Sequence, residues 1–250
     1  MRHTTLLLLS LFFGLLSTQT AQADIEAGLK AAMAADTRSD ADKARDKNRK
    51  PLETLKFFGL KEDMRVLELL PGGGWYSKLL APVLADKGKL MVSIGTDGVQ
   101  KMIEGGQLPG VEVVSFDQTS FGPGEGGRRY AIKGFKLNTS DIDMVLTFRN
   151  LHNFDPATRT VLNSEAFRVL NKGGLYGVVD HTRRHMQSDN TENWRRMDPV
   201  LMIKEIEAAG FEFVDFSDLH YRYDDELVYE VGRRSVSGNT DRFTLLFKKP

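Results

Sequence analysis

The sequence contains no cysteine. This absence excludes disulfides, thiol nucleophiles and thiolate metal ligands, and it leaves no atom for attaching a lipid anchor. The chain also lacks a net charge, because 34 basic side chains are matched by 34 acidic ones. No basic stripe with interleaved aromatic residues stands out, so nucleic acid is not an expected partner.

Apolar runs long enough to span a bilayer are lacking as well. The block from Leu6 to Leu16 follows a short basic start and precedes Ala21-Gln22-Ala23, whose small residues suit a signal peptidase. We therefore expect residues 1–23 to be a signal peptide that is cleaved before Asp24. The mature chain would then be exported, to the periplasm, without a stable membrane anchor.

Residues 24–60 are expected to form a helical arm. The segment is rich in alanine and then densely charged, with arginine and aspartate near helical spacing between Arg38 and Arg49. Two interpretations stay open, a solvated arm and a cover over the active site. Pro51 and the apolar residues up to Leu60 predict a packed helix before the first strand.

Residues 61–250 alternate short apolar runs with helical patterns, which predicts one α/β domain around a parallel sheet. Helices are expected at 76–84 and after the Asp-Pro pairs at 155–156 and 198–199. The glycine-rich stretch 121–127 is expected to be a mobile loop. The expected strands are 66–70, 89–94, 111–116, 142–148, 175–179, 211–216 and 243–247.

A glycine-rich bend, Gly72 to Gly74, lies between the first strand and its helix. This order places backbone N–H groups and a helix N-terminus at the carboxyl end of the strand, where they suit a nucleotide or a carboxylate. Glycine also lets a ligand approach the backbone where a Cβ would collide.

The chain resembles the class I S-adenosylmethionine-dependent methyltransferases, and within them a group of exported methyltransferase-like proteins of unassigned substrate. The matching segments are 66–76 (VLELLPGGGWY), 143–153 (DMVLTFRNLHN), 170–174 (LNKGG), 178–181 (VVDH) and 240–243 (TDRF). The resemblance implies a Rossmann-like, seven-stranded, mostly parallel sheet with helices on both faces and an antiparallel last strand.

The resemblance also implies a cofactor site for S-adenosylmethionine. Its expected residues are Glu68 at the methionine end, Pro71 and Gly72 to Gly74 beneath the cofactor, Asp97 at the ribose and Asp117 at the adenine amino group. The wider family has glycine at the position of Leu70, and the larger side chain narrows the space under the cofactor.

Three residues beyond the fourth and fifth strands are the candidate catalytic residues, Asn150, His152 and His181. A histidine could take a proton from an oxygen or nitrogen nucleophile as it attacks the methyl group; alternatively, these side chains only cap strand ends. His181 and His185 have a metal-type spacing, but Arg183 and Arg184 beside them disfavour a cation, so no metal is expected.

Two functions follow. The first is methyl transfer to a small-molecule substrate. The alternative is an exported, non-catalytic binding protein that retains the fold, which export and Leu70 favour, whereas Glu68, Asn150 and His152 favour the enzyme.

Overall fold

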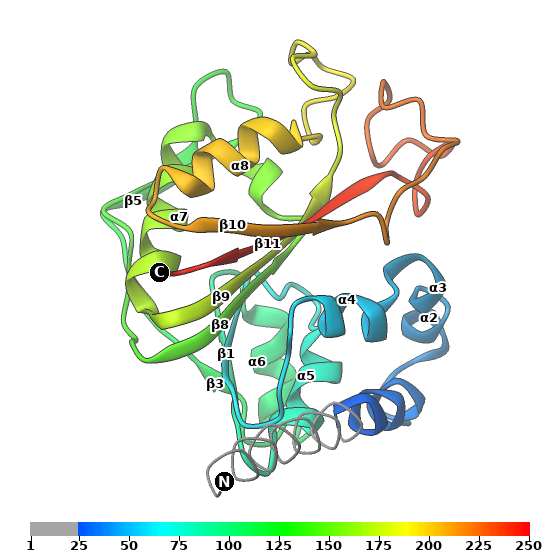
Figure 1. Ribbon diagram of the computed structural model, residues 1–250, viewed down its shortest axis with the longest axis vertical. Helices are drawn as coiled ribbons and strands as arrows, with labels where there is room; N and C mark the ends of the chain where they lie inside the picture. The colour runs from blue at the N-terminus through cyan, green and yellow to red at the C-terminus, as the bar shows by residue number, and fades with distance from the viewer. Residues whose placement is uncertain (1–24) are drawn as a thin grey trace, which may run out of the picture.

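The computed structural model describes residues 25–250, so the expected signal peptide lies outside the described residues. Its centre is a seven-stranded sheet in the order β3-β2-β1-β8-β9-β11-β10 (Figure 1). The bounds are β1 (Arg65–Leu69), β2 (Lys89–Ser93), β3 (Glu112–Val113), β8 (Ile142–Phe148), β9 (Leu170–His181), β10 (Glu212–Ser217) and β11 (Arg242–Lys248).

Strand β11 is the antiparallel member of this sheet. It pairs antiparallel with both β9 and β10, whereas β1 pairs parallel with β2 and β8, and β8 pairs parallel with β9. All residues of β8 except Asp143 are buried, as expected of a central parallel strand that is covered on both faces. The predicted Rossmann-like sheet with an antiparallel last strand is confirmed.

Helices cover both faces of the sheet. On one face lie α4 (Pro51–Phe57), α5 (Ser77–Leu84) and α6 (Asp97–Glu104), with a core that includes Leu55, Leu80 and Val99. On the other lie α7 (Pro156–Val169) and α8 (Pro199–Glu207), which contribute Leu162 and Met202 to a second core. These two layers are visible on opposite sides of the sheet in Figure 1.

The two Asp-Pro pairs start helices, as predicted. The Asp155 side chain accepts a hydrogen bond from the backbone of Thr158, and the Asp198 side chain accepts from the backbones of Val200 and Leu201. In both helices the following proline occupies the first turn, where its missing N–H costs nothing.

The prediction of a mobile loop at residues 121–127 is wrong in part. Residues Ser120–Pro123 form β5, which pairs antiparallel with β6 (Tyr130–Lys133) in a separate hairpin. A two-stranded ribbon tolerates Gly122 and Pro123 because one edge of each strand needs no partner. The third strand is also shorter than expected, because β4 (Phe116–Asp117) leaves the main sheet to pair with β7 (Lys136–Leu137).

The N-terminal arm is packed onto the domain. Residues 25–34 are helical, and α2 (Asp40–Lys43) and α3 (Asp46–Arg49) follow. The guanidinium of Arg38 is buried against Asp46, and the indole of Trp75 donates to the carbonyl oxygen of Asp42 over 3.1 Å. These contacts hold α2 and α3 beside the carboxyl edge of the sheet.

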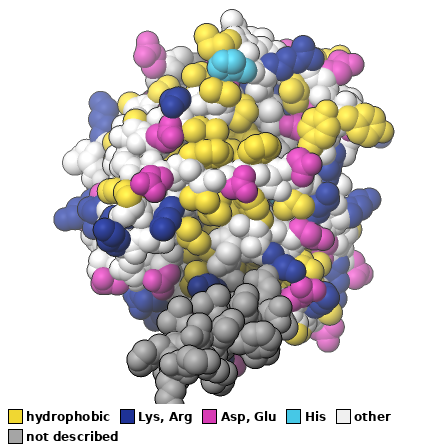
Figure 2. All heavy atoms as spheres, in the orientation of Figure 1, with side chains coloured by type: hydrophobic (Ala, Val, Ile, Leu, Met, Phe, Trp, Pro, Cys, Tyr) yellow, Lys and Arg dark blue, Asp and Glu magenta, His cyan; other side chains and the backbone are white. Residues whose placement is uncertain are grey.

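The surface carries both signs of charge. On the face drawn in Figure 2, hydrophobic side chains gather along the middle, and basic and acidic side chains lie intermixed around them. No helix within residues 25–250 has both the length and the apolarity to cross a bilayer.

Candidate functional site

Backbone strain concentrates where three neighbouring strands end. Leu70, Ile94 and Arg149 directly follow β1, β2 and β8, and all have a positive φ, of 56°, 62° and 63°. This left-handed region is costly for residues with a Cβ, and such strain clusters at binding and catalytic sites. The carboxyl edge of the sheet is therefore the candidate site.

The glycine bend is open on one side and packed on the other. A Cβ added to Gly72 or Gly73 would meet no atom within 4 Å. A Cβ on Gly74 would collide with Met102 of α6, and one on Gly98 would lie 2.5 Å from the carbonyl oxygen of Gly72. The first turn of α6 thus lies against the bend, and the main chain of Gly72 and Gly73 remains accessible.

An apolar cavity of about 410 Å³ lies at the same edge. Leu70 forms part of its wall, and the side-chain amide of Asn150 donates to the Leu70 carbonyl oxygen over 3.0 Å. Asn150 therefore ties the end of β8 to the end of β1. The lining consists of Leu70, Ile94, Gly95, Phe116, Gln118, Phe121, Tyr130, Ile132, Asn153 and Phe154.

The acidic residues expected at the cofactor have different surroundings. Glu68 is buried and accepts a hydrogen bond of 2.6 Å from the Ser77 hydroxyl of α5, and burial raises its pKa to about 7. Asp97 is exposed at the start of α6, and Asp117 is exposed and accepts from the side chain of Asn138. Pro71 is buried.

A histidine–aspartate pair lies beyond the ends of β8 and β9. Nδ1 of His152 is 2.5 Å from Oδ1 of Asp180, and the other carboxylate oxygen accepts from the His152 backbone. Asp180 also accepts from the backbone N–H of His181. A carboxylate can only accept, so Nδ1 of His152 carries a hydrogen, and in the neutral imidazole Nε2 has the lone pair.

The two predicted catalytic histidines are neighbours, with ring centroids 5.4 Å apart. Nδ1 of His181 lies 2.8 Å from the hydroxyl of Thr240. Burial is the main cause that lowers the pKa of His181 well below its usual value, and the charge of Arg242 and that of His152, when it is protonated, add to the effect. His181 is therefore neutral at physiological pH.

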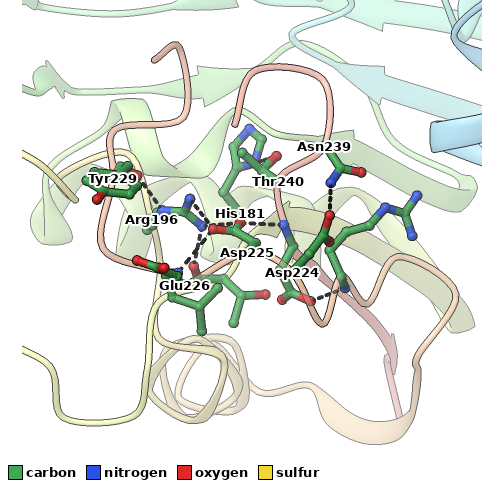
Figure 3. A network of polar contacts seen from close by, with 12 residues as sticks. His181, Arg196, Asp224, Asp225, Glu226, Tyr229, Asn239 and Thr240 are labelled. Atoms are coloured by element: carbon green, nitrogen blue, oxygen red, sulfur yellow. Dashed lines mark hydrogen bonds and ion pairs between the residues drawn. The ribbon is translucent and has the colours of Figure 1, made fainter. Parts of the chain in front are cut away.

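Behind His181, a polar network fixes the segment that follows β10 (Figure 3). The guanidinium of Arg196 is paired with both carboxylate oxygens of Asp225 at 2.9 Å, and these side chains are fully buried. Asp225 also accepts from the backbone of Asp241, next to Thr240. The Thr240 hydroxyl is thereby held against His181.

A second cavity, of about 400 Å³, opens beside His181. It lies between α3 of the arm, the ends of β8 and β9, the start of β11 and the segments around residues 195 and 231–240. No Asp or Glu belongs to its described lining. Five arginines do belong to it, namely Arg45, Arg49, Arg149, Arg195 and Arg242.

Donor atoms of His152, Asp180 and His181 lie within 4.8 Å of one another, which is close enough for all three to contact one metal ion. The Asp180 oxygens already accept three hydrogen bonds from the two histidines. Arg149, Arg196 and Arg242 are close enough to depress the pKa of His181. A positive surrounding of this kind disfavours a cation. His185 lies apart, where it contacts Asp198.

Known proteins resemble this chain in structure. Neither a protein-family model nor a curated protein matches the sequence. A SAM-dependent methyltransferase from Aquifex aeolicus superposes with a TM-score of 0.59 at 17% identity, over 83% of this chain and 93% of that one. The [4+2]-cyclase SpnF superposes with a TM-score of 0.55 at 17% identity, over 93% of this chain and 95% of the cyclase.

The chain has the fold of the S-adenosylmethionine-dependent methyltransferases. Because a cyclase shares this fold, the fold alone does not select the reaction. The residues at the carboxyl edge fit a nucleoside, since the main chain of Gly72, Gly73 and Gly95 is open to a ligand and an apolar cavity adjoins it.

Sequence reasoning did not assign several residues of this site. Asp180 was part of a matching motif, but its contact with His152 joins two strand ends that are 28 positions apart. The cationic cavity joins Arg49 of the arm to Arg149 and Arg242. The feature that these three arginines share is their place at an element boundary: Arg49 ends α3, Arg149 follows β8 and Arg242 begins β11.

Proposed function

We propose that the protein transfers a methyl group from S-adenosylmethionine to an oxygen or nitrogen atom of a small molecule. The methyltransferase fold supports this proposal, and the observation that carries it is the His152–Asp180 pair at the carboxyl ends of β8 and β9. The bound cofactor supplies a methyl group on a sulfonium, which is already a good leaving group, so the protein has mainly to position the reactants.

The nucleoside part of the cofactor would lie over the open main chain of Gly72 and Gly73 and against the cavity wall that Leu70 and Gly95 form. Asp97 and Asp117 are exposed near this edge and offer carboxylates to hydroxyl or amino groups. Glu68 supports the site from behind, because its carboxyl group is used by Ser77.

His152 would be the general base. Asp180 holds its Nδ1–H, and Nε2 makes no hydrogen bond within residues 25–250, so Nε2 is the atom that takes the proton from the acceptor. His181, which is neutral and borders the neighbouring cavity, would position the acceptor. Export to the periplasm, after removal of residues 1–23, completes the proposal.

Calorimetric titration with S-adenosylmethionine and S-adenosylhomocysteine tests the cofactor claim. Micromolar binding that is abolished by Gly73→Leu, with an unchanged melting temperature, would support it, because the added side chain enters the open space above the bend. No detectable heat at millimolar cofactor would leave the non-catalytic binding protein as the function. Recovery of a chain that starts at Asp24 from the periplasm tests export; a chain that retains Met1 would contradict it.

A further inference from the structure

The cavity beside His181 has an excess of positive charge that the protein does not neutralise. Of its five arginines, Arg195 is paired with Glu230. The side chains of Arg45, Arg49 and Arg149 make no ion pair and no hydrogen bond to any of residues 25–250, and Arg242 donates only to the carbonyl oxygen of Asn48. Arg45 is exposed and Arg149 is half-buried, whereas Arg49 and Arg242 are buried. Proteins rarely bury a charge without a partner, because desolvation is costly.

Arg49 is the strongest evidence among these residues for a bound anion. It is 5% exposed, yet its guanidinium has no acceptor among residues 25–250 and lies over the Trp75 ring, 4.3 Å from the centroid. This contact fixes the orientation of the guanidinium, and the cavity is the space it borders. Nε of Arg242, 6% exposed, also lacks a partner.

The arginines also repel one another. Burial lowers the pKa of Arg49 to about 9 and that of Arg242 to about 10, and in both cases the charge of Arg149 adds to the effect. Arg149 in addition has a left-handed backbone, with φ of 63°. Backbone strain and charge repulsion of this kind are typical of binding sites, where a bound anion relieves the repulsion between the arginines.

We propose that this cavity binds the methyl acceptor and that the acceptor carries at least two negative charges, as a phosphate ester, a diphosphate or a dicarboxylate does. Guanidinium groups bind such anions through paired hydrogen bonds. The assignment to the acceptor rests on the proposed function, whereas the anion site itself does not. His181 lies in the wall of the cavity, so an acceptor bound there lies beside the histidine pair.

The same arginines could instead receive the carboxylate of the methionine part of the cofactor. One carboxylate would leave most of the guanidinium groups unpaired, so a ligand with more charge fits the cavity better. The two sources differ in an experiment, because a cofactor carboxylate and a separate anion at the same arginines would compete.

Inorganic pyrophosphate is the probe for the test. The full chain is titrated calorimetrically with pyrophosphate at constant ionic strength, alone and with saturating S-adenosylhomocysteine. We expect pyrophosphate to bind, and Arg149→Gln and Arg45→Gln each to weaken it about tenfold or more, the equivalent of about 1.4 kcal/mol. Arg168→Gln removes the same charge from α7, far in the fold from the cavity, and should leave binding unchanged.

Folding is controlled within the same series. Without ligand, Arg149→Gln should melt at the same or a higher temperature than the wild type, since one like charge is removed, while pyrophosphate no longer raises its melting temperature. A structural arginine would give the opposite result.

Three outcomes would overturn the proposal. Equal affinity of the wild type and Arg149→Gln for pyrophosphate, or no binding to either, removes the anion site. Competition between pyrophosphate and S-adenosylhomocysteine assigns the arginines to the cofactor. A failure of the proposed function is distinct from these three, because pyrophosphate would then still bind while S-adenosylhomocysteine would not.

Discussion

The side-chain amide of Asn150 donates a hydrogen bond to the carbonyl oxygen of Leu70 over 3.0 Å, and this contact joins the ends of β8 and β1. Leu70 has a φ of 56°, where a residue without a Cβ would be unstrained. Asn150 thus stabilises a backbone conformation from which the Leu70 side chain borders the apolar cavity.

Replacing Leu70 by glycine and by alanine isolates the backbone strain. Both changes remove the isobutyl group, but only alanine keeps a Cβ at positive φ. We expect Leu70→Gly to be more stable than Leu70→Ala by about 1 kcal/mol, the reverse of the order at an ordinary position. Urea unfolding of the two variants measures this difference. If alanine were the more stable variant, Leu70 would not be strained.

The sheet could be predicted because its strands are buried on both faces. Residues 142–148 have almost no polar side chain, and the structure places β8 over the same residues, Ile142–Phe148. The Asp-Pro pairs at 155 and 198 mark helix starts through local hydrogen bonds, which the sequence alone specifies. Exposed elements were harder to predict. Strand β5 forms by pairing with β6, and its residues Gly122 and Pro123 are typical of loops.

The candidate site was predictable only where it follows strand ends. His152 and His181 were found in this way, and the structure places their rings 5.4 Å apart. Arg49 could not be found, because its place beside Trp75 depends on how the arm folds back onto the domain. A densely charged arm predicts a solvated surface, and only tertiary contacts show that Arg38 and Arg49 are buried.

Glu68 should make stability depend on pH. Its pKa is 4.5 in an unfolded chain and about 7 in the fold, so the folded state prefers the protonated form. Its stabilising contribution is complete below pH 4.5, decreases as the pH rises towards 7 and is lost above that pH. Relative to the Glu68→Gln variant, the wild type should therefore lose on the order of 3 kcal/mol between pH 4.5 and pH 8.

Urea unfolding of the wild type and Glu68→Gln at four pH values across this window checks the prediction. Glutamine keeps the size of the side chain and can still accept from Ser77, so the variant should fold. Asp97→Asn serves as the control, because Asp97 is exposed. If the free energies of unfolding of the wild type and Glu68→Gln differed by the same amount at every pH, the pKa of Glu68 would not be raised in the fold.

Arg196 and Asp225 should form one of the costliest pairs to break. Both side chains are fully buried, and Asp225 also accepts from the backbones of Leu227 and Asp241. Asp225→Ala would leave an unpaired guanidinium inside the protein, so we expect a loss of about 3–5 kcal/mol. Thermal and urea unfolding measure it.

Glu192→Ala is the matched control for this prediction. Glu192 pairs with Arg233 at 3.3 Å, and both side chains are about half exposed. Removing an exposed pair should cost about 0.5 kcal/mol or less. Similar losses for Asp225→Ala and Glu192→Ala would contradict a buried, desolvated pair in the network that supports Thr240.

The tautomer of His152 is the last prediction, and it tests the proposed base directly. Because Asp180 accepts from Nδ1, the hydrogen of neutral His152 resides on Nδ1 and Nε2 is unprotonated. In Asp180→Asn, the amide no longer imposes this preference, and the Nε2–H tautomer should become populated. Nitrogen-15 NMR of the imidazoles distinguishes the two forms. Residence of the hydrogen on Nε2 of His152 in the wild type would exclude it as a base, since that nitrogen could then accept no proton from the nucleophile.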